Sequence, residues 1–148
     1  MAKPTKKGSQ LSPVGHEMIG DTLGTPILQC GLLQEIESLH KEDAWLQSTG
    51  PSSKTLVKHP DLRVVLIAMR KNTRMPEHKA TATISVQTLA GHVRLRLPDR
   101  TADLPMGQLL VLDQGVRHDV EAVEDSALLL TMSWHDQKSE TDETGSQK

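Results

Sequence analysis

The sequence predicts an all-β protein, a jelly-roll β-barrel with one N-terminal helix packed outside it. Three observations lead to this prediction. Residues 54–135 consist of short apolar or alternating stretches separated by turn residues, a pattern typical of sandwiches and barrels. Only one stretch has helical periodicity, and both ends of the chain are too polar to bury a core. We therefore divide the chain into a flexible N-terminal tail (1–13), a helical segment (14–53), the barrel (54–135) and a disordered C-terminal tail (136–148).

The composition narrows the functional classes. The chain has 148 residues, which is enough for one domain, and its net charge of −2 gives no general attraction to nucleic acid. No apolar run approaches the roughly 20 residues that a membrane helix needs. Cys30 is the only cysteine, so an internal disulfide is excluded. With no secretory leader recognisable at the N-terminus, we expect a cytoplasmic protein that contacts neither membrane nor nucleic acid.

The helix is predicted from the spacing of its apolar residues. Leu32, Ile36, Leu39 and Leu46 recur at helical intervals, and polar residues such as Glu35 occupy the other faces. The sequence Ser-Thr-Gly-Pro-Ser-Ser at 48–53 ends the helix, because Gly favours a C-cap and Pro cannot continue it. A single apolar stripe implies packing against something larger, and Trp45 is expected to anchor that packing.

The strands follow in order between turns. Strand-like stretches cover 55–57, 62–69, 80–89, 93–97, 109–112, 118–122 and 127–134. The third stretch alternates well, with Ala80, Ala82, Ile84 and Val86 on one face and polar residues on the other. Phe and Tyr are absent, so aliphatic side chains and Met must build the core. About eight strands at this spacing suit a jelly roll.

Two motifs in the barrel resemble those of the cupin superfamily, and the chain is most similar to its small single-domain, RmlC-like members. The first motif has Gly, His-x-His, Glu and Gly, and the second has Gly, Pro-x-Gly, His and Asn. The corresponding residues here are Asn72, His78, Ala80, Ile84 and Gly91, then Gly107, Asp113, Gly115, His118 and Ala122. We interpret Asn72, Gly91, Gly107 and Gly115 as structural turn residues, because Gly, and Asn after it, tolerate positive φ.

The resemblance also implies a site. Cupins that carry a metal bind a divalent ion such as Fe, Mn, Ni or Zn through three histidines and a glutamate. Here only His78 and His118 remain, since Ala80 and Ile84 cannot coordinate a metal. Two imidazoles make a poor site, so this ligand count favours a protein without a bound metal. Alternation directs both histidines into the apolar interior.

Two polar residues are weaker candidates for the same site. Gln87 has the opposite strand parity to Ile84, and His92 shares its parity with Arg94 and Arg96, which should face solvent. Only a β-bulge would reverse these directions.

Three functions remain open. The first is a non-enzymatic protein that binds a small organic molecule in the barrel beside a degenerate metal site. The second is a metal-dependent cupin enzyme, of oxygenase or isomerase type, that uses His78 and His118. The third is a dimeric structural or interaction module, since small cupins often form homodimers. No catalytic residue can be named, and the sequence does not decide whether the protein is an enzyme.

Overall fold

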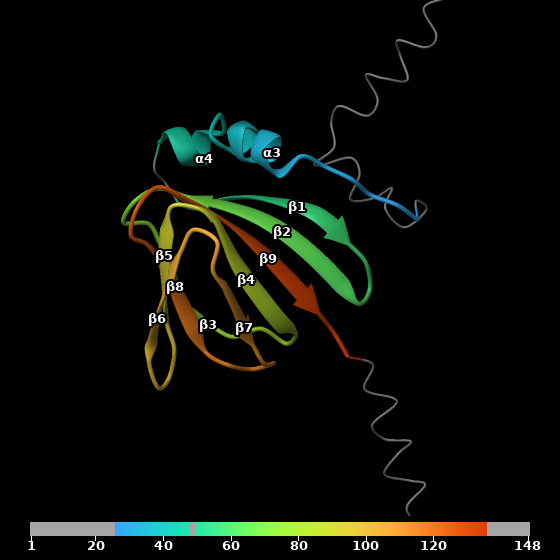
Figure 1. Ribbon diagram of the computed structural model, residues 1–148, viewed down its shortest axis with the longest axis vertical. Helices are drawn as coiled ribbons and strands as arrows, with labels where there is room; N and C mark the ends of the chain where they lie inside the picture. Colours follow the sequence, from blue (N-terminus) through green and yellow to red (C-terminus); the bar gives the residue numbers. More distant parts are fainter. Residues whose placement is uncertain (1–25, 48–49, 136–148) are drawn as a thin grey trace, which may run out of the picture.

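The computed structural model describes residues 26–47 and 50–135 (Figure 1). It contains two short helices, α3 (Leu32–Leu39) and α4 (Asp43–Leu46). Nine strands follow within these residues: β1 (Ser52–Lys58), β2 (Leu62–Met69), β3 (Arg74–His78), β4 (Thr83–Ala90), β5 (His92–Arg96), β6 (Thr101–Pro105), β7 (Leu109–Leu112), β8 (His118–Ala122) and β9 (Ser126–Ser133). The predicted all-β class is confirmed. No described helix is long and apolar enough to cross a membrane.

The strands form two antiparallel sheets that pack face to face. One sheet has the order β1-β2-β9-β4-β7 and the other β3-β8-β5-β6. The chain alternates between the sheets in the second half of the barrel, because β4 and β7 belong to the first sheet while β5, β6 and β8 belong to the second. This is the jelly-roll arrangement that the sequence predicts.

Apolar side chains from both sheets fill the space between them. The cluster of buried residues comprises Ile67, Met69, Ala82, Ile84, Val86, Val93, Leu95, Leu104, Leu112, Val120, Ala122 and Leu128. Three of these belong to the alternating face that the sequence identified. Ala82 precedes β4, whereas Ile84 and Val86 lie on it and are each 3% exposed. The barrel interior is therefore a packed core rather than an open cavity in its middle.

A second apolar cluster joins the helices to the outer face of the first sheet, as Figure 1 shows. Ile36, Leu39 and Trp45 pack on Leu56 and Leu66, among others. Trp45 is thus a packing anchor, as expected.

The helix prediction is wrong in two respects. The apolar stripe does not form one continuous helix, because residues 40–42 turn between α3 and α4 and leave Leu46 59% exposed. Glu35 is not on a solvated face but buried, because Lys54 of β1 points at the helix and its Nζ lies 2.7 Å from Glu35 Oε2.

Two strands were missed by the sequence prediction, and two began elsewhere. β1 begins at Ser52, before the predicted stretch 55–57 and the predicted start of the barrel at residue 54. β3 (Arg-Met-Pro-Glu-His) and β6 (Thr-Ala-Asp-Leu-Pro) each bury little, and in β6 only Leu104 is fully buried. β4 begins at Thr83 rather than at residue 80. Strands with only one or two apolar inward positions give too little alternation to detect.

The four turn residues all have positive φ: 70° at Asn72, 77° at Gly91, 91° at Gly107 and 84° at Gly115. At Gly91 space is also restricted, since a Cβ there would lie 2.3 Å from the Asp125 carbonyl oxygen. Asn72 is the only described residue other than Gly with positive φ. Its backbone N–H donates to the Ala122 carbonyl at 2.8 Å.

Candidate functional site

The barrel has an end at which the two sheets bring their histidines together, here called the barrel mouth. It is defined by the last residues of β3, β7 and β9 and the first residues of β2, β4 and β8. Antiparallel pairing places these ends side by side: β2 starts beside the end of β9, and β4 starts beside the ends of β9 and β7. β3 ends beside the start of β8. In Figure 1 the β3 and β7 part of this end lies toward the bottom of the barrel.

His78 and His118 form a cross-strand pair at the barrel mouth. They are direct partners in the β3–β8 register, and their ring centroids lie 4.3 Å apart with an angle of 63° between the ring planes. The register shifts between Met75 and His78. This irregularity puts His78 on the same face as His118, because directly opposed residues project to the same side of a sheet.

Both rings are held through the same nitrogen. Nδ1 of His78 lies 2.8 Å from the Pro76 carbonyl oxygen, and Nδ1 of His118 lies 3.0 Å from that of Val116. A carbonyl can only accept, so each Nδ1 carries a proton, and in the neutral form of either ring the Nε2 lone pair is free. Among the described residues, no hydrogen bond to either Nε2 is present. The pair thus offers two fixed acceptors.

His118 is kept in its neutral form by its surroundings. The side chain is buried, with the residue 3% exposed. Burial lowers the pKa of His118 below its usual value, and the neighbouring His78 acts in the same direction. The Val116 carbonyl and Asp119 oppose this pKa shift but do not cancel it.

The solved structures that resemble this chain share this architecture. A conserved protein of unknown function from Streptococcus pyogenes is 24% identical, with a TM-score of 0.61 over 74% of this chain and 89% of that one. A cupin 2 conserved barrel domain protein from Leptotrichia buccalis is 23% identical, with a TM-score of 0.58 over 66% of this chain and 45% of that one. An RmlC-like cupin from Desulfovibrio desulfuricans is 19% identical, with a TM-score of 0.54 over 58% and 84%. The chain has the cupin fold. No protein-family model matches it, and no curated protein matches it in sequence.

The residues at the cupin metal position do not form a complete donor set. Ile84 is 3% exposed within the apolar core, and Ala80 packs against the same cluster. Within residues 26–47 and 50–135, no three His, Cys, Asp or Glu side chains lie close enough to hold a metal ion. Two imidazole nitrogens are fewer than the three protein ligands of a catalytic zinc site. The metal of other cupins therefore does not fit these residues.

The expectation that both histidines face the interior agrees with their shared side of the sheet, but His78 is not buried there. The residue is exposed, because it is the last residue of β3 and lies at the rim, where the strand pairing ends. Of the two, only His118 is buried, and the His78 ring contacts it edge to face.

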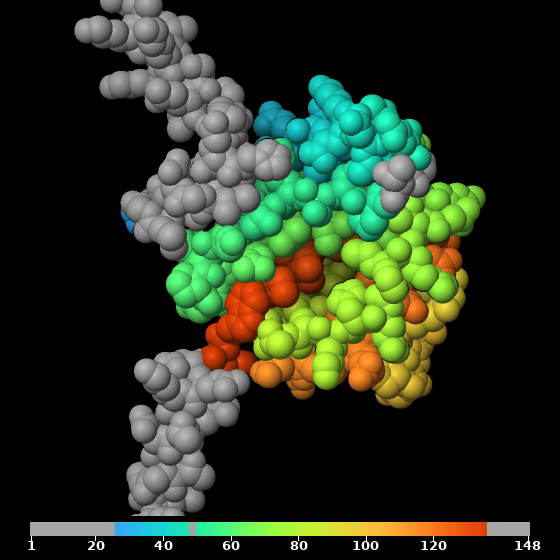
Figure 2. All heavy atoms as spheres, turned by 180° about the vertical axis from the view of Figure 1, so that it is seen from behind, coloured from blue at the N-terminus to red at the C-terminus, as the bar shows by residue number. Residues whose placement is uncertain are grey.

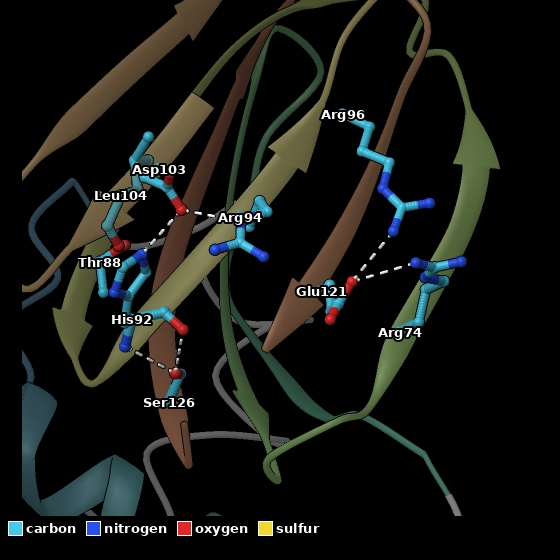
Figure 3. A network of polar contacts seen from close by, with 9 residues as sticks. All are labelled: Arg74, Thr88, His92, Arg94, Arg96, Asp103, Leu104, Glu121 and Ser126. Carbon is cyan, nitrogen blue, oxygen red and sulfur yellow. Dashed lines mark hydrogen bonds and ion pairs between the residues drawn. The ribbon is translucent and has the colours of Figure 1, made fainter. Parts of the chain in front are cut away.

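The two weaker candidates lie elsewhere. Gln87 is exposed on the outer face of the first sheet, opposite Leu109 and Leu129. His92 lies at the far end of β5, and its Nε2 lies 3.1 Å from Asp103 Oδ1 (Figure 3). Asp103 also accepts from Arg94 on the outer face of the second sheet. Neither residue contributes to the mouth.

Arg63 and Trp134, which the sequence prediction did not assign to a site, also belong to the mouth. Arg63 has the inward parity of Val65 and Ile67 on β2, and it pairs in register with Met132. Its guanidinium carbon lies 5.4 Å from the centroid of the Trp134 ring. Strand parity would have identified Arg63, because a charged residue at an inward position of an apolar strand is unusual.

Proposed function

We propose that this protein binds a small organic molecule at the mouth of its cupin barrel without a protein-bound metal. The observation that supports the proposal is the His78–His118 pair, in which both Nδ1 atoms are bonded to backbone carbonyls and neither Nε2 atom has a partner within residues 26–47 and 50–135. Such a pair accepts hydrogen bonds from hydroxyl or N–H groups of a ligand. Sites of this kind commonly combine an apolar wall with a few placed polar groups.

The position of the ligand follows from packing. The middle of the barrel is closely filled by its apolar cluster, so the ligand meets the protein at the rim. There the partly buried apolar residues Met132 and Trp134 lie at the end of β9. In Figure 2 the surface is hollowed between β9, in red, and the yellow-green segment that carries β3.

The proposal is tested by binding measurements on histidine variants. In His78→Asn and His118→Asn the amide N–H group can replace the Nδ1 donor, whereas the Nε2 acceptor is lost. We expect ligands found by screening hydroxylated and amino metabolites to shift the ¹⁵Nε2 resonances of both histidines and to bind on the order of tenfold more weakly to each variant. His92→Asn, on the outer face, is the control and should bind normally. Variants that melt at the wild-type temperature and bind every ligand unchanged would overturn the proposal.

A second function is favoured by one observation on β7, at the edge of the first sheet. β7 is an edge strand, and its outward residues Leu109 and Val111 are 60% and 57% exposed. Edge strands are usually protected by Lys or Pro, and β7 contains neither. We therefore also propose that β7 pairs with β7 of a second copy in a two-fold homodimer. Light scattering should give twice the chain mass for the wild type and the monomer mass for Val111→Lys; a monomeric wild type would refute the dimer.

A further inference from the structure

Arg63 is placed at the barrel mouth by the strand register. It lies opposite Met132 on β9, and Met132 lies opposite Ile84 on β4. Ile84 occupies the position of the glutamate in the cupin motif. At about 4.8 Å per strand, the Arg63 backbone is therefore about 10 Å from that position at the same level of the barrel. Its side chain starts on the inner face, with Val65 and Ile67 beneath it.

The guanidinium of Arg63 has an unused donor. Its Nε is fully buried and has no hydrogen-bond partner among the described residues. None of the ion pairs formed by these residues includes Arg63. A buried N–H without a partner costs about 1–3 kcal/mol and calls for an explanation such as a bound group.

A second arginine–tryptophan pair in the same protein shows what a satisfied arrangement looks like. Arg70 stacks on Trp45 with its guanidinium carbon 4.7 Å from the ring centroid. Its Nε donates to the Trp45 carbonyl oxygen at 2.6 Å. The Arg63 guanidinium carbon lies over the Trp134 ring at the longer distance of 5.4 Å, and no acceptor for its Nε is present among the described residues. Of the two arginines, the one whose Nε has no acceptor among the described residues is therefore the one at the mouth.

The tryptophan beneath Arg63 is itself fixed. Trp134 Nε1 donates to Thr81 Oγ1 at 3.3 Å, and its backbone N–H donates to the Asp61 carbonyl at 3.1 Å. A fixed ring orients the plane of the guanidinium stacked on it. The two terminal nitrogens of Arg63 also form no hydrogen bond among the described residues and, unlike Nε, do not belong to the buried unpartnered atoms. The paired N–H donors of a guanidinium match the two oxygens of a carboxylate.

We infer that Arg63 binds the carboxylate of the ligand, so that the molecule recognised at the mouth is a small organic acid. This inference rests on the proposed function and narrows its ligand class. The Nε2 atoms of His78 and His118 are acceptors, so the ligand also carries a hydroxyl or N–H donor. A hydroxy acid combines the two groups, and the corresponding neutral amide lacks the charge that Arg63 recognises.

The inference is tested with lactate and malate as probes and lactamide as the neutral match, using the full chain. Binding is followed by the ¹⁵Nε signal of Arg63 and the ¹⁵Nε2 signals of the two histidines. We expect both acids to shift all three signals, with binding weakened on the order of tenfold or more in Arg63→Gln. Arg63→Lys keeps the charge without the fork and should also weaken binding. Arg94→Gln, which removes the same charge from the outer face, should change nothing.

The outcomes separate this inference from the proposed function. Equal binding of lactate and lactamide with shifted histidine signals, unchanged in Arg63→Gln, would refute carboxylate recognition and leave the proposed function standing. If neither the acids nor lactamide nor the screened metabolites move the arginine or the histidine signals, both proposals fail. If Arg63→Gln melts early, the Arg63→Lys variant and the wild-type Arg63 signal still decide the question.

Discussion

Removing the carboxylate of Glu35 while keeping Lys54 is expected to destabilise the fold strongly. The two side chains lie between α3 and β1, and their exposed fractions are 11% and 9%. In Glu35→Leu the Lys54 ammonium keeps only Ser38 Oγ, at 3.5 Å, which is at the limit of a hydrogen bond. The lysine is thus left buried and nearly unpaired.

The expected loss of unfolding free energy in Glu35→Leu follows from this burial. Removing one partner of a buried ion pair costs about 3–5 kcal/mol, and the residual exposure of both groups places this pair at about 3 kcal/mol. For a domain of this size the melting temperature should fall by about 10 °C. Replacing both residues, in Glu35→Leu with Lys54→Met, removes the unpaired charge and should restore most of the stability.

Urea unfolding of the wild type, both single variants and the double variant completes a double-mutant cycle. Glu77→Leu is the control, since Glu77 and its partner Arg117 are 63% and 61% exposed and such pairs contribute about 0–1 kcal/mol. A double variant as unstable as the sum of the single variants would refute the argument, because the cost would then come from packing and not from an unpaired charge.

The remaining predictions concern turns, pH and metal. Gly91→Ala should cost about 2 kcal/mol or more in urea unfolding, because the residue has φ of 77° and no room beside Asp125; a cost below that of an ordinary surface change would contradict it. Asn72→Ala should cost about 1–2 kcal/mol, since φ is 70°, whereas Asn72→Gly should be nearly neutral. Because the pKa of His118 is lowered in the folded state, the unfolded chain binds more protons, so stability should be complete above about pH 6.5 and decrease below it. His118→Asn should flatten this dependence, and an NMR titration giving a pKa above 6.5 would reverse the sign. Elemental analysis after exposure to iron, manganese, nickel and zinc should find far less than one metal per chain; stoichiometric metal lost in the His78→Asn, His118→Asn double variant would reveal a third donor.

Much of the fold was predictable because its main strands obey simple alternation. The inward set on β4, which includes Ile84 and Val86, is visible in the sequence. β3 and β6 were not visible, because each buries only one or two apolar side chains fully or in part and contains a proline. Glu35 was misplaced for a related reason: its partner Lys54 is distant in sequence, and helical spacing alone cannot indicate a buried charge pair.

The site was predictable only in part. His78 and His118 could be paired because the motif fixes their positions, yet the exposure of His78 depends on where the pairing of β3 with β8 ends. Arg63 was overlooked inside the apolar run 62–69. Its significance lies in an unpartnered Nε and a ring 5.4 Å away, and both are tertiary features that no spacing in the sequence encodes.

The two tryptophans lie in different parts of the molecule. Trp45 belongs to the cluster beneath the helices and Trp134 packs against the barrel core, and the chain contains no tyrosine. Its intrinsic fluorescence therefore comes from two sites, one in each apolar cluster, with an arginine stacked on each ring. A variant that retains only Trp45 would report release of the helices, and one that retains only Trp134 would report events at the mouth. The protein thus contains two native optical probes, and no external dye is needed to tell undocking from ligand binding.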